Sequence, residues 1–329
     1  MQIALAVFFF SLLATSAVLA DDADSEGWKF VQENGRTYYK KGDIKEKAWR
    51  VIDGKTYYFD HVSGEMVVGW QYIPFPSKGS TIGPYPNGLR LESMPMPQWY
   101  YFGQDGVLQE FVGKQVLEAK TATNTNKHHG EQYDSPAEKR VYYFEDQRSY
   151  HTLKTGWVHD EGHWYYLQKD GGFDARINSL TVGELVRGWT NDNSTWYYLD
   201  PTTAAMQTGW KQLGNKWYYL RSSGAMATGW YQEGSTWYYL DQVNGDMKTG
   251  WQYLGNKWYY LRSSGAMATG WVKDGSTWYY LNASNGDMKT GWTKVGGNWY
   301  YLNSSGAMVT GSQTIDGKVY NFASSGEWI

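Results

Sequence analysis

The stretch "GWQYLGNKWYYLRSSGAMATGW", from Gly250 to Trp271, contains the pattern from which the fold of this chain can be predicted. Its central run WYYL consists of strand-forming residues, and the Gly-Asn pair before it is a turn signal. The stretch therefore predicts one β-hairpin, followed by a second turn at "SSG". A single hairpin cannot bury an apolar face by itself, so hairpins of this kind must pack on one another.

The same pattern returns along the C-terminal half of the chain at a nearly constant spacing. Gly-Trp pairs place tryptophans, alternately 21 and 20 residues apart, at Trp189, Trp210, Trp230, Trp251, Trp271 and Trp292. Seven residues after each of them, a second tryptophan opens the next WYYL run. A period of roughly 20 residues is typical of a solenoid, in which each unit packs only on its neighbours. We therefore predict an all-β solenoid of stacked hairpins.

The N-terminal half is a degenerate copy of this pattern. Gly-Trp-like positions recur 21 residues apart, and the WYYL runs are replaced by TYYK at 37–40, TYYF at 56–59 and VYYF at 141–144. Two inserts rich in polar residues, proline or glycine, 74–97 and 120–139, are expected to be loops. We predict a degenerate repeat region at 21–155 and a consensus repeat region at 156–329.

The first 20 residues form an apolar run that ends in the small residues Val18 and Ala20, followed directly by an acidic stretch. This is the pattern of a secretory signal peptide at 1–20, so we expect export and no transmembrane anchor in the mature chain. The net charge of −3 gives no support for nucleic-acid binding, and the absence of cysteine removes disulfides as a source of stability.

The aromatic residues indicate a binding surface, because the chain holds 29 tyrosines and 19 tryptophans. Residues two apart in a strand share a face, so the tryptophan and the second tyrosine of WYYL point the same way. We expect each gap between hairpins to be walled by two tryptophans of one repeat and the second tyrosine of the next, with a methionine as its floor. Such a box attracts a weakly hydrated cation such as a quaternary ammonium, at about 0.5–2 kcal/mol per cation–π contact.

The motif "GW…GNKWYYL…SSGAMATGW" resembles the choline-binding repeats of pneumococcal surface proteins and murein hydrolases, closely over 156–311 and loosely over 27–155. The resemblance implies a left-handed superhelix of hairpins, with choline of teichoic acid between consecutive hairpins. Carried over residue by residue, it implies five cages: Trp189, Trp196, Tyr219 and Met206; Trp210, Trp217, Tyr239 and Met226; Trp230, Trp237, Tyr260 and Met247; Trp251, Trp258, Tyr280 and Met267; Trp271, Trp278, Tyr301 and Met288.

Both ends of the chain depart from this pattern. At the C-terminus, Asn321 stands where the second tyrosine is expected, so Trp292 and Trp299 are predicted to lack a third wall. In the N-terminal half, one wall is predicted to be missing at each of three WYYL-like runs, those of Thr37, Thr56 and Val141.

Nothing in the sequence indicates an enzyme. His159 and His163 of "HDEGH" fall at a hairpin turn, whereas a metalloprotease would carry its two histidines on a helix, so we predict no metal site. Repeats begin at Trp28 and leave no room for a catalytic domain. We predict no cofactor, with choline as the ligand.

These observations predict a secreted, non-enzymatic surface protein, held non-covalently at the cell wall by phosphorylcholine of teichoic and lipoteichoic acids. Such a protein would compete with choline-binding murein hydrolases for the same polymer. Two alternatives stay open: a glucan- or carbohydrate-binding repeat protein, and a cell-wall hydrolase with a cryptic activity in residues 27–155.

Overall fold

The computed structural model describes residues 27–74, 97–129, 138–146, 151–169 and 181–329. Every regular element within these ranges is a β-strand, which confirms the predicted all-β class. No helix among these residues is long and apolar enough to cross a membrane. The predicted signal peptide at 1–20 and nearly all of the predicted loop at 74–97 lie outside the described residues.

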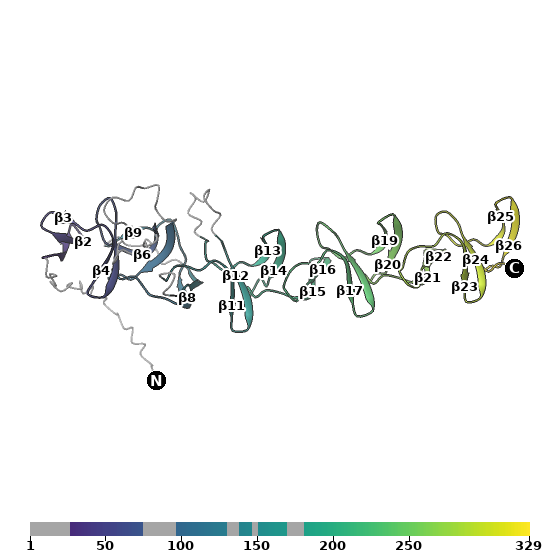
Figure 1. Ribbon diagram of the computed structural model, residues 1–329, viewed down its shortest axis with the longest axis horizontal. Coiled ribbons are helices and arrows are strands. Elements are labelled where there is room, and N and C mark those ends of the chain that lie inside the picture. The colour runs from purple at the N-terminus through teal and green to yellow at the C-terminus, as the bar shows by residue number, and fades with distance from the viewer. Residues whose placement is uncertain (1–26, 75–96, 130–137, 147–150, 170–180) are drawn as a thin grey trace, which may run out of the picture. The chain divides into compact units, whose positions relative to one another are not determined.

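The chain divides into two compact units, shown in Figure 1. The N-terminal unit comprises the residues up to Val158 together with Tyr166–Leu185. The C-terminal unit comprises His159–Tyr165 and Val186–Ile329. Strands β11 (Gly156–Asp160) and β12 (His163–Leu167) form a hairpin that contributes residues to both units.

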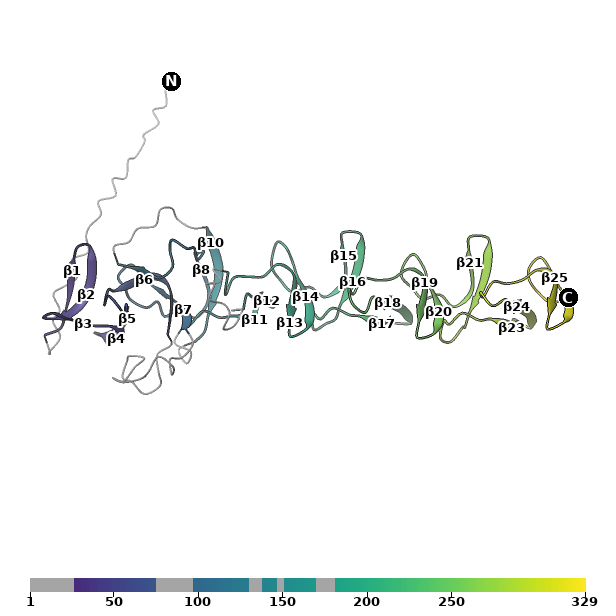
Figure 2. The same ribbon diagram turned by 90° about the horizontal axis from the view of Figure 1, so that it is seen from above.

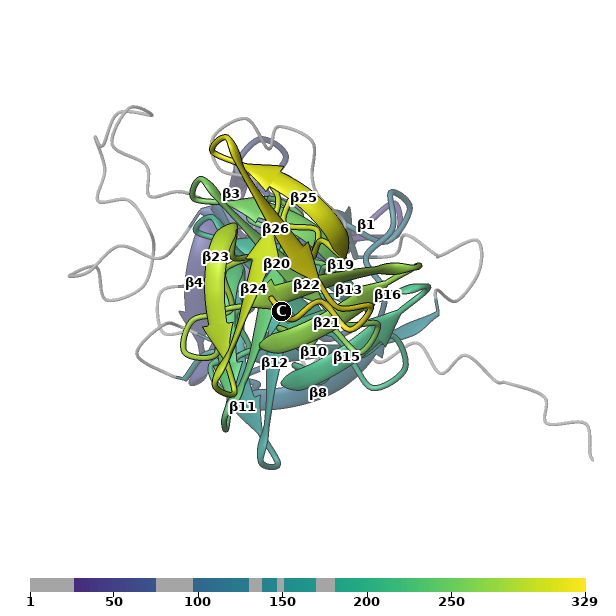
Figure 3. The same ribbon diagram turned by 90° about the vertical axis from the view of Figure 1, so that its right-hand side faces the viewer.

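The C-terminal unit is a succession of two-stranded antiparallel hairpins, as predicted. Figures 2 and 3 show that successive hairpins of this unit point in different directions around its long axis. The hairpins are β13 (Gly188–Asp192) with β14 (Thr195–Leu199), β15 (Gly209–Leu213) with β16 (Lys216–Leu220), β17 (Gly229–Glu233) with β18 (Thr236–Leu240), β19 (Gly250–Leu254) with β20 (Lys257–Leu261), β21 (Gly270–Asp274) with β22 (Thr277–Leu281), β23 (Gly291–Val295) with β24 (Asn298–Leu302), and β25 (Gly311–Ile315) with β26 (Lys318–Phe322).

One register is repeated in all of these hairpins. In β19–β20, Trp251 lies directly opposite Tyr260. The two turn residues, Gly255 and Asn256, have φ values of 56° and 64°, which is the backbone that a tight two-residue hairpin turn requires. The turn residues therefore fix which aromatic residues share a face of each hairpin.

Consecutive hairpins are joined by backbone hydrogen bonds and by a buried leucine. From Leu199 onward, the leucine that ends each WYYL run is fully buried and bridges to the methionine of the following linker, as Leu261 does to Met267. The N–H of Met267 then donates to the carbonyl of Trp237, on the preceding hairpin, at 2.7 Å. The stacking of hairpins is therefore maintained by the backbone as well as by side chains.

The N-terminal unit is built from hairpins of the same register with added strands. The two-stranded pairs are β4 (Ala48–Ile52) with β5 (Lys55–Phe59), and β8 (Gly113–Glu118) with β10 (Lys139–Phe144). In the first three-stranded sheet, β2 (Arg36–Lys41) lies between β1 (Lys29–Glu33) and β3 (Ile44–Lys45). In the second, β6 (Val67–Pro74) lies between β7 (Pro97–Phe102) and β9 (Lys127–His128). The segment 120–139 is thus not only a loop, because β9 lies in it and extends the sheet of β6.

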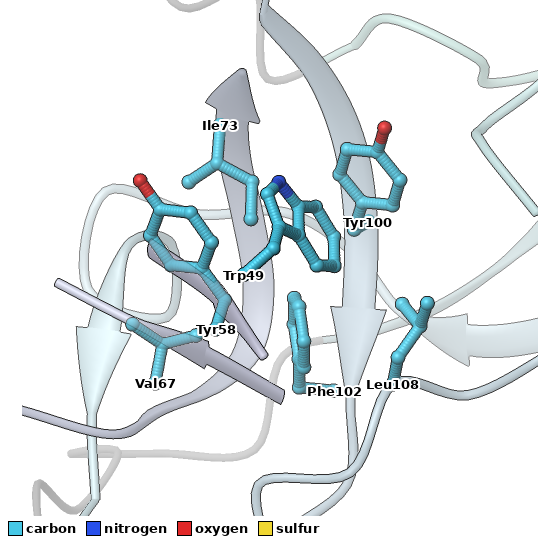
Figure 4. Packing of buried hydrophobic residues seen from close by; sticks show 7 residues of the cluster. All are labelled: Trp49, Tyr58, Val67, Ile73, Tyr100, Phe102 and Leu108. Atoms are coloured by element: carbon cyan, nitrogen blue, oxygen red, sulfur yellow. The ribbon is translucent and has the colours of Figure 1, made fainter. Parts of the chain in front are cut away.

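The N-terminal unit has a conventional core, whereas the C-terminal unit keeps its tryptophans at the surface. Trp49 is 2% exposed and lies among Tyr58, Ile73, Tyr100 and Phe102 (Figure 4). Its indole N–H donates to the carbonyl of Pro74 at 2.8 Å. Side chains therefore fill the space around the Trp49 ring, and a cavity of about 240 Å³ beside this core is lined by Tyr58, Ile73 and His128 among others.

The two histidines of "HDEGH" lie on β11 and β12, on either side of a tight turn. Glu161 and Gly162 in that turn have φ values of 48° and 80°, which confirms the predicted turn. No group of three potential metal ligands occurs within the described part of the chain.

Aromatic cages between consecutive hairpins

A cavity of about 310 Å³ lies between the hairpins β17–β18 and β19–β20. Trp230 and Trp237 of the first hairpin stand nearly perpendicular, with ring centroids 6.3 Å apart. Tyr259 of the second hairpin lies 5.0 Å from Trp230, at 69°. Met267 completes the apolar lining, so the cavity has three aromatic walls and a thioether.

The same grouping recurs at the neighbouring joints of the C-terminal unit. Cavities of about 550 and 420 Å³ lie at the joints of Trp189 and Trp210. At the next two joints, the ring centroid of Trp251 lies 4.7 Å from that of Tyr279, and the ring centroid of Trp271 lies 4.8 Å from that of Tyr300. Each cage is named below by its Gly-Trp residue, and its members are Trp189, Trp196, Tyr218 and Met226; Trp210, Trp217, Tyr238 and Met247; Trp230, Trp237, Tyr259 and Met267; Trp251, Trp258, Tyr279 and Met288; Trp271, Trp278, Tyr300 and Met308.

The structure brings together the two tryptophans of every predicted cage but supplies a different tyrosine. The predicted third walls, Tyr219, Tyr239, Tyr260, Tyr280 and Tyr301, are the second tyrosines of their WYYL runs, and each lies opposite the Gly-Trp residue of its own hairpin. Tyr260, for example, packs on Trp251 at 5.1 Å. Two stacked hairpins meet through opposite faces, so the wall donated by the following hairpin is its first tyrosine, which points away from that hairpin's own tryptophans.

The methionine assignment also shifts by one repeat. Met226 was expected in cage 210, but it lines cage 189, because its N–H bonds to the carbonyl of Trp196 at 2.8 Å. Met247, Met267 and Met288 are displaced in the same way. Met206, expected in cage 189, shifts in the same way, since its backbone N–H donates to the carbonyl of Trp164 at 2.7 Å.

The WYYL tryptophans form accessible edges of the cages. Trp196 is 44% exposed and Trp237 is 38% exposed, whereas the corresponding Trp99 of the N-terminal unit is 3% exposed. A small organic cation can therefore reach the C-terminal cages from solvent without any rearrangement of the backbone.

A carboxylate borders every second cage among those described. The indole N–H of Trp210 donates to Glu233 at 3.1 Å, and that of Trp251 donates to Asp274 at 3.0 Å. The equivalent positions facing the other three cages are Leu213, Leu254 and Val295. The alternation follows the two-repeat period of the sequence, a signal that a search for an acidic residue in every repeat misses.

The last joint is also a cage. The presence of Asn321 at the position of the second tyrosine led to the prediction that Trp292 and Trp299 would lack a third wall, and this prediction is wrong. The position that matters is the first tyrosine of the run, Tyr320, which lies 4.9 Å from Trp292. Trp328 takes the place of the methionine. Its backbone N–H donates to the carbonyl of Trp299 at 2.8 Å, and its ring centroid lies 5.7 Å from that of Trp292. This terminal cage thus contains four aromatic rings.

At two joints of the N-terminal unit, threonine replaces the WYYL tryptophan, as the sequence indicates, and the residues around it are buried. Thr37 is fully buried, with its hydroxyl 2.9 Å from Nδ1 of His129. At the joint of Thr56, the rings of Trp49 and Tyr100 lie 4.9 Å apart in the core shown in Figure 4. These two joints leave no accessible aromatic cage.

Comparison with protein-family profiles identifies the repeats. A profile described as "Choline-binding repeat" matches residues 207–250, 248–290 and 289–329. A profile described as "Putative cell wall binding repeat" matches residues 97–108, 155–173 and 188–202. Neither description is of a catalytic domain. A comparison with curated proteins gives no match.

Solved structures of pneumococcal choline-binding proteins match nearly the whole chain. CbpJ from Streptococcus pneumoniae TIGR4 is 66% identical, over 92% of this chain and 100% of that one, with a TM-score of 0.81. Choline-binding protein F of Streptococcus pneumoniae, crystallised in the presence of a tetrasaccharide-pentapeptide peptidoglycan analogue, is 55% identical, over 92% and 99% of the two chains, with a TM-score of 0.82. The chain belongs to the choline-binding repeat family and is a choline-binding cell-wall protein.

Proposed function

We propose that the cages of the C-terminal unit bind the trimethylammonium group of choline and thereby hold the exported protein, non-covalently, on phosphorylcholine of teichoic and lipoteichoic acids. The observation that carries the proposal is the recurrence of two tryptophans and one tyrosine around an accessible space, with nearly constant distances and angles at each joint. The negative π faces of three rings attract a cation that loses little hydration on entry, as a quaternary ammonium does.

Attachment to the wall comes from the number of cages rather than from the strength of one. A single cation–π cage is weak, with about 0.5–2 kcal/mol per contact. Teichoic acid presents many phosphorylcholine groups on one polymer, so successive cages bind at a high effective concentration. The terminal cage of Trp292 adds a sixth position to the series.

The first experiment is retention on a tertiary-amine resin, followed by elution with choline. We expect choline to release the protein and dextran not to, whereas a carbohydrate-binding repeat protein would show the reverse. Indole ¹⁵N–¹H resonances of the cage tryptophans should shift as choline is added at millimolar concentration. Unchanged resonances would contradict the proposal.

The matched variants are Tyr259→Leu, which removes a wall of cage 230, and Tyr260→Phe, which keeps the ring that packs on Trp251. The first should weaken choline binding at Trp230 and Trp237, and the second should leave it unchanged. This pair separates a binding role of the rings from a purely structural one.

We further propose that the protein restrains choline-binding murein hydrolases by occupying the same phosphorylcholine groups. The supporting observation is that family profiles match repeats over residues 97–108, 155–173, 188–202 and 207–329. Protein bound through these repeats would occupy phosphorylcholine groups that such a hydrolase also needs. Purified protein should slow the release of fragments from cell walls by such a hydrolase. A variant with Trp→Ala changes in all C-terminal cages should not, and wall zymography of the protein alone tests the alternative of a cryptic hydrolase.

A further inference from the structure

One joint of the N-terminal unit keeps all the walls of a cage. Trp70 of β6 and Trp99 of β7 stand nearly perpendicular, with ring centroids 6.2 Å apart. Tyr142, the first tyrosine of VYYF on β10, lies 4.8 Å from Trp70 at 61°, and the N–H of Leu153 donates to the carbonyl of Trp99 at 3.0 Å.

These values match the open cages of the C-terminal unit. In cage 210, Trp210 and Tyr238 are 4.8 Å apart at 62°, and in cage 230 the two tryptophans are 6.3 Å apart at 85°. Leu153 occupies the position of the methionine, since it bridges to the last residue of the VYYF run as Met226 bridges to Leu220. The joint of Trp70 is therefore built as a cation cage.

This cage already contains a cationic side chain, that of Lys120. Its Nζ lies 4.7 Å from the ring of Trp70, 5.4 Å from that of Trp99 and 4.3 Å from that of Tyr142. The same nitrogen donates to the carbonyl of Val182 at 2.7 Å. In cage 271, by contrast, Lys273 approaches only one wall, Trp278, at 5.9 Å.

We propose that Lys120 is an internal ligand, which holds the position that choline takes in the C-terminal cages and so closes this cage to choline. The inference rests on the function proposed above, because it assigns the same guest position to an ammonium supplied by the chain. The segment that follows β8 thus fills a binding site through Lys120, and the same contacts hold this segment against the hairpins.

The burial of Lys120 requires such a cage. Lys120 is 3% exposed, and an ammonium taken out of water must find compensating interactions. Among the described residues, no carboxylate lies within ion-pair distance of it; Glu184 accepts instead from the hydroxyl of Tyr142 at 3.2 Å and faces Arg140 at 3.9 Å. The groups in direct contact with the ammonium are the three π faces and the Val182 carbonyl, and the Glu184 carboxylate favours the charged form from a longer distance.

The test is a crystal structure of the Lys120→Ala protein grown with saturating choline, with wild type under the same conditions as reference. We expect choline in the C-terminal cages of both proteins, and an additional choline among Trp70, Trp99 and Tyr142 only in the variant. Lys120→Met, which retains the length of the stem without the head group, is the matched control and should admit no choline there. If the C-terminal cages of Lys120→Ala contain choline and its Trp70 cage is empty, this inference is overturned and the proposed function is not. Empty cages throughout would overturn the proposed function and this inference with it.

A second measurement uses the wild-type protein and does not depend on how the variants fold. The ¹³Cε chemical shift of Lys120, in protein labelled at lysine, distinguishes an ammonium from an amine. At pH 6 we expect the shift of an ammonium, held among the rings beside Glu184, Arg140 and the Tyr142 hydroxyl. The shift of a neutral amine at that pH would show that the cage does not hold a cation.

Discussion

Trp251 and Tyr279 lie on consecutive hairpins, with ring centroids 4.7 Å apart at 66°. Neither hairpin contains this contact by itself. The unit of sequence that repeats is therefore a hairpin, whereas the unit that forms an aromatic cage is the joint between two hairpins. Loss of one hairpin would remove walls from two cages, because its tryptophans face one neighbour and its first tyrosine faces the other.

Separate substitutions of the two tyrosines of one WYYL run should have unequal effects on choline binding. Tyr259→Leu removes a cation–π wall and should weaken choline binding at cage 230 by about 0.5–2 kcal/mol, or roughly 2- to 30-fold. The measurement is choline titration of the indole resonances of Trp230 and Trp237, with Tyr260→Phe as control. Equal effects of the two changes would mean that the third wall has been assigned to the wrong tyrosine.

The cages bordered by a carboxylate should depend more strongly on salt than the others. Glu233→Gln should weaken choline binding at cage 210 by up to about 1 kcal/mol, because an exposed carboxylate contributes little and is screened. The loss should shrink at high ionic strength. Cage 230 in the same variant is the internal control, and a similar loss there would contradict the assignment of Glu233 to cage 210.

The terminal cage should bind choline more tightly than the cages that carry a methionine. Trp328 adds a fourth ring 5.7 Å from Trp292 and 5.8 Å from Tyr320. Trp328→Met should convert the site into an ordinary cage and weaken binding by about 0.5–2 kcal/mol, the value of one cation–π contact. The indole resonance of Trp299 reports the affinity, and an unchanged or higher affinity in Trp328→Met would refute the role of the fourth ring.

The linker glycines should be more sensitive to substitution than the turn glycines. A Cβ on Gly265 would lie 2.2 Å from Sδ of Met247, whereas a Cβ on Gly255 would meet nothing within 4 Å. Both residues have positive φ, 82° and 56°, so both alanine variants lose about 1 kcal/mol or more from backbone strain. Gly265→Ala should lose more than Gly255→Ala in thermal unfolding, because it also displaces the methionine. Equal losses would show that the methionine contact contributes nothing.

Lys120 should make the stability of the wild-type protein depend on pH in the alkaline range. Burial lowers the pKa of Lys120 from 10.5 to about 7, with the Glu184 carboxylate acting in the opposite direction. Between pH 7 and 10.5 the unfolded chain therefore binds more protons at Lys120 than the folded chain, and stability rises with pH. The free energy of unfolding of wild type relative to Lys120→Met should rise by at most about 1.4 kcal/mol per pH unit.

Below about pH 7 this difference should level off, since Lys120 is then protonated in both states. The other charged groups at the joint, Glu184 and Arg140, are present in both proteins and cancel in the comparison. A difference that falls with rising pH would show that the folded pKa of Lys120 lies above its unfolded value.

Local patterns in the amino-acid sequence predict the fold and indicate the kind of ligand. The spacing of Gly-Trp pairs, the WYYL runs and the Gly-containing turns predict hairpins, because strand propensity and turn geometry are local properties of the chain. The same spacing predicts which two tryptophans meet, since Trp251 and Trp258 lie in one hairpin. The large number of tyrosines and tryptophans, together with the resemblance to choline-binding repeats, predicts a quaternary ammonium as the ligand.

Which other residues complete each cage depends on how consecutive hairpins pack, and no local pattern in the sequence predicts it. Tyr259 and Tyr260 are adjacent and identical in type, and the choice between them depends on which face of one hairpin meets the next. That Trp328 replaces a methionine depends on a hydrogen bond between two hairpins. Lys120 is 50 residues from Trp70 in the sequence, and no periodicity connects the two. Their contact follows from the packing of an insert onto the repeats, which is a non-local property of the folded chain.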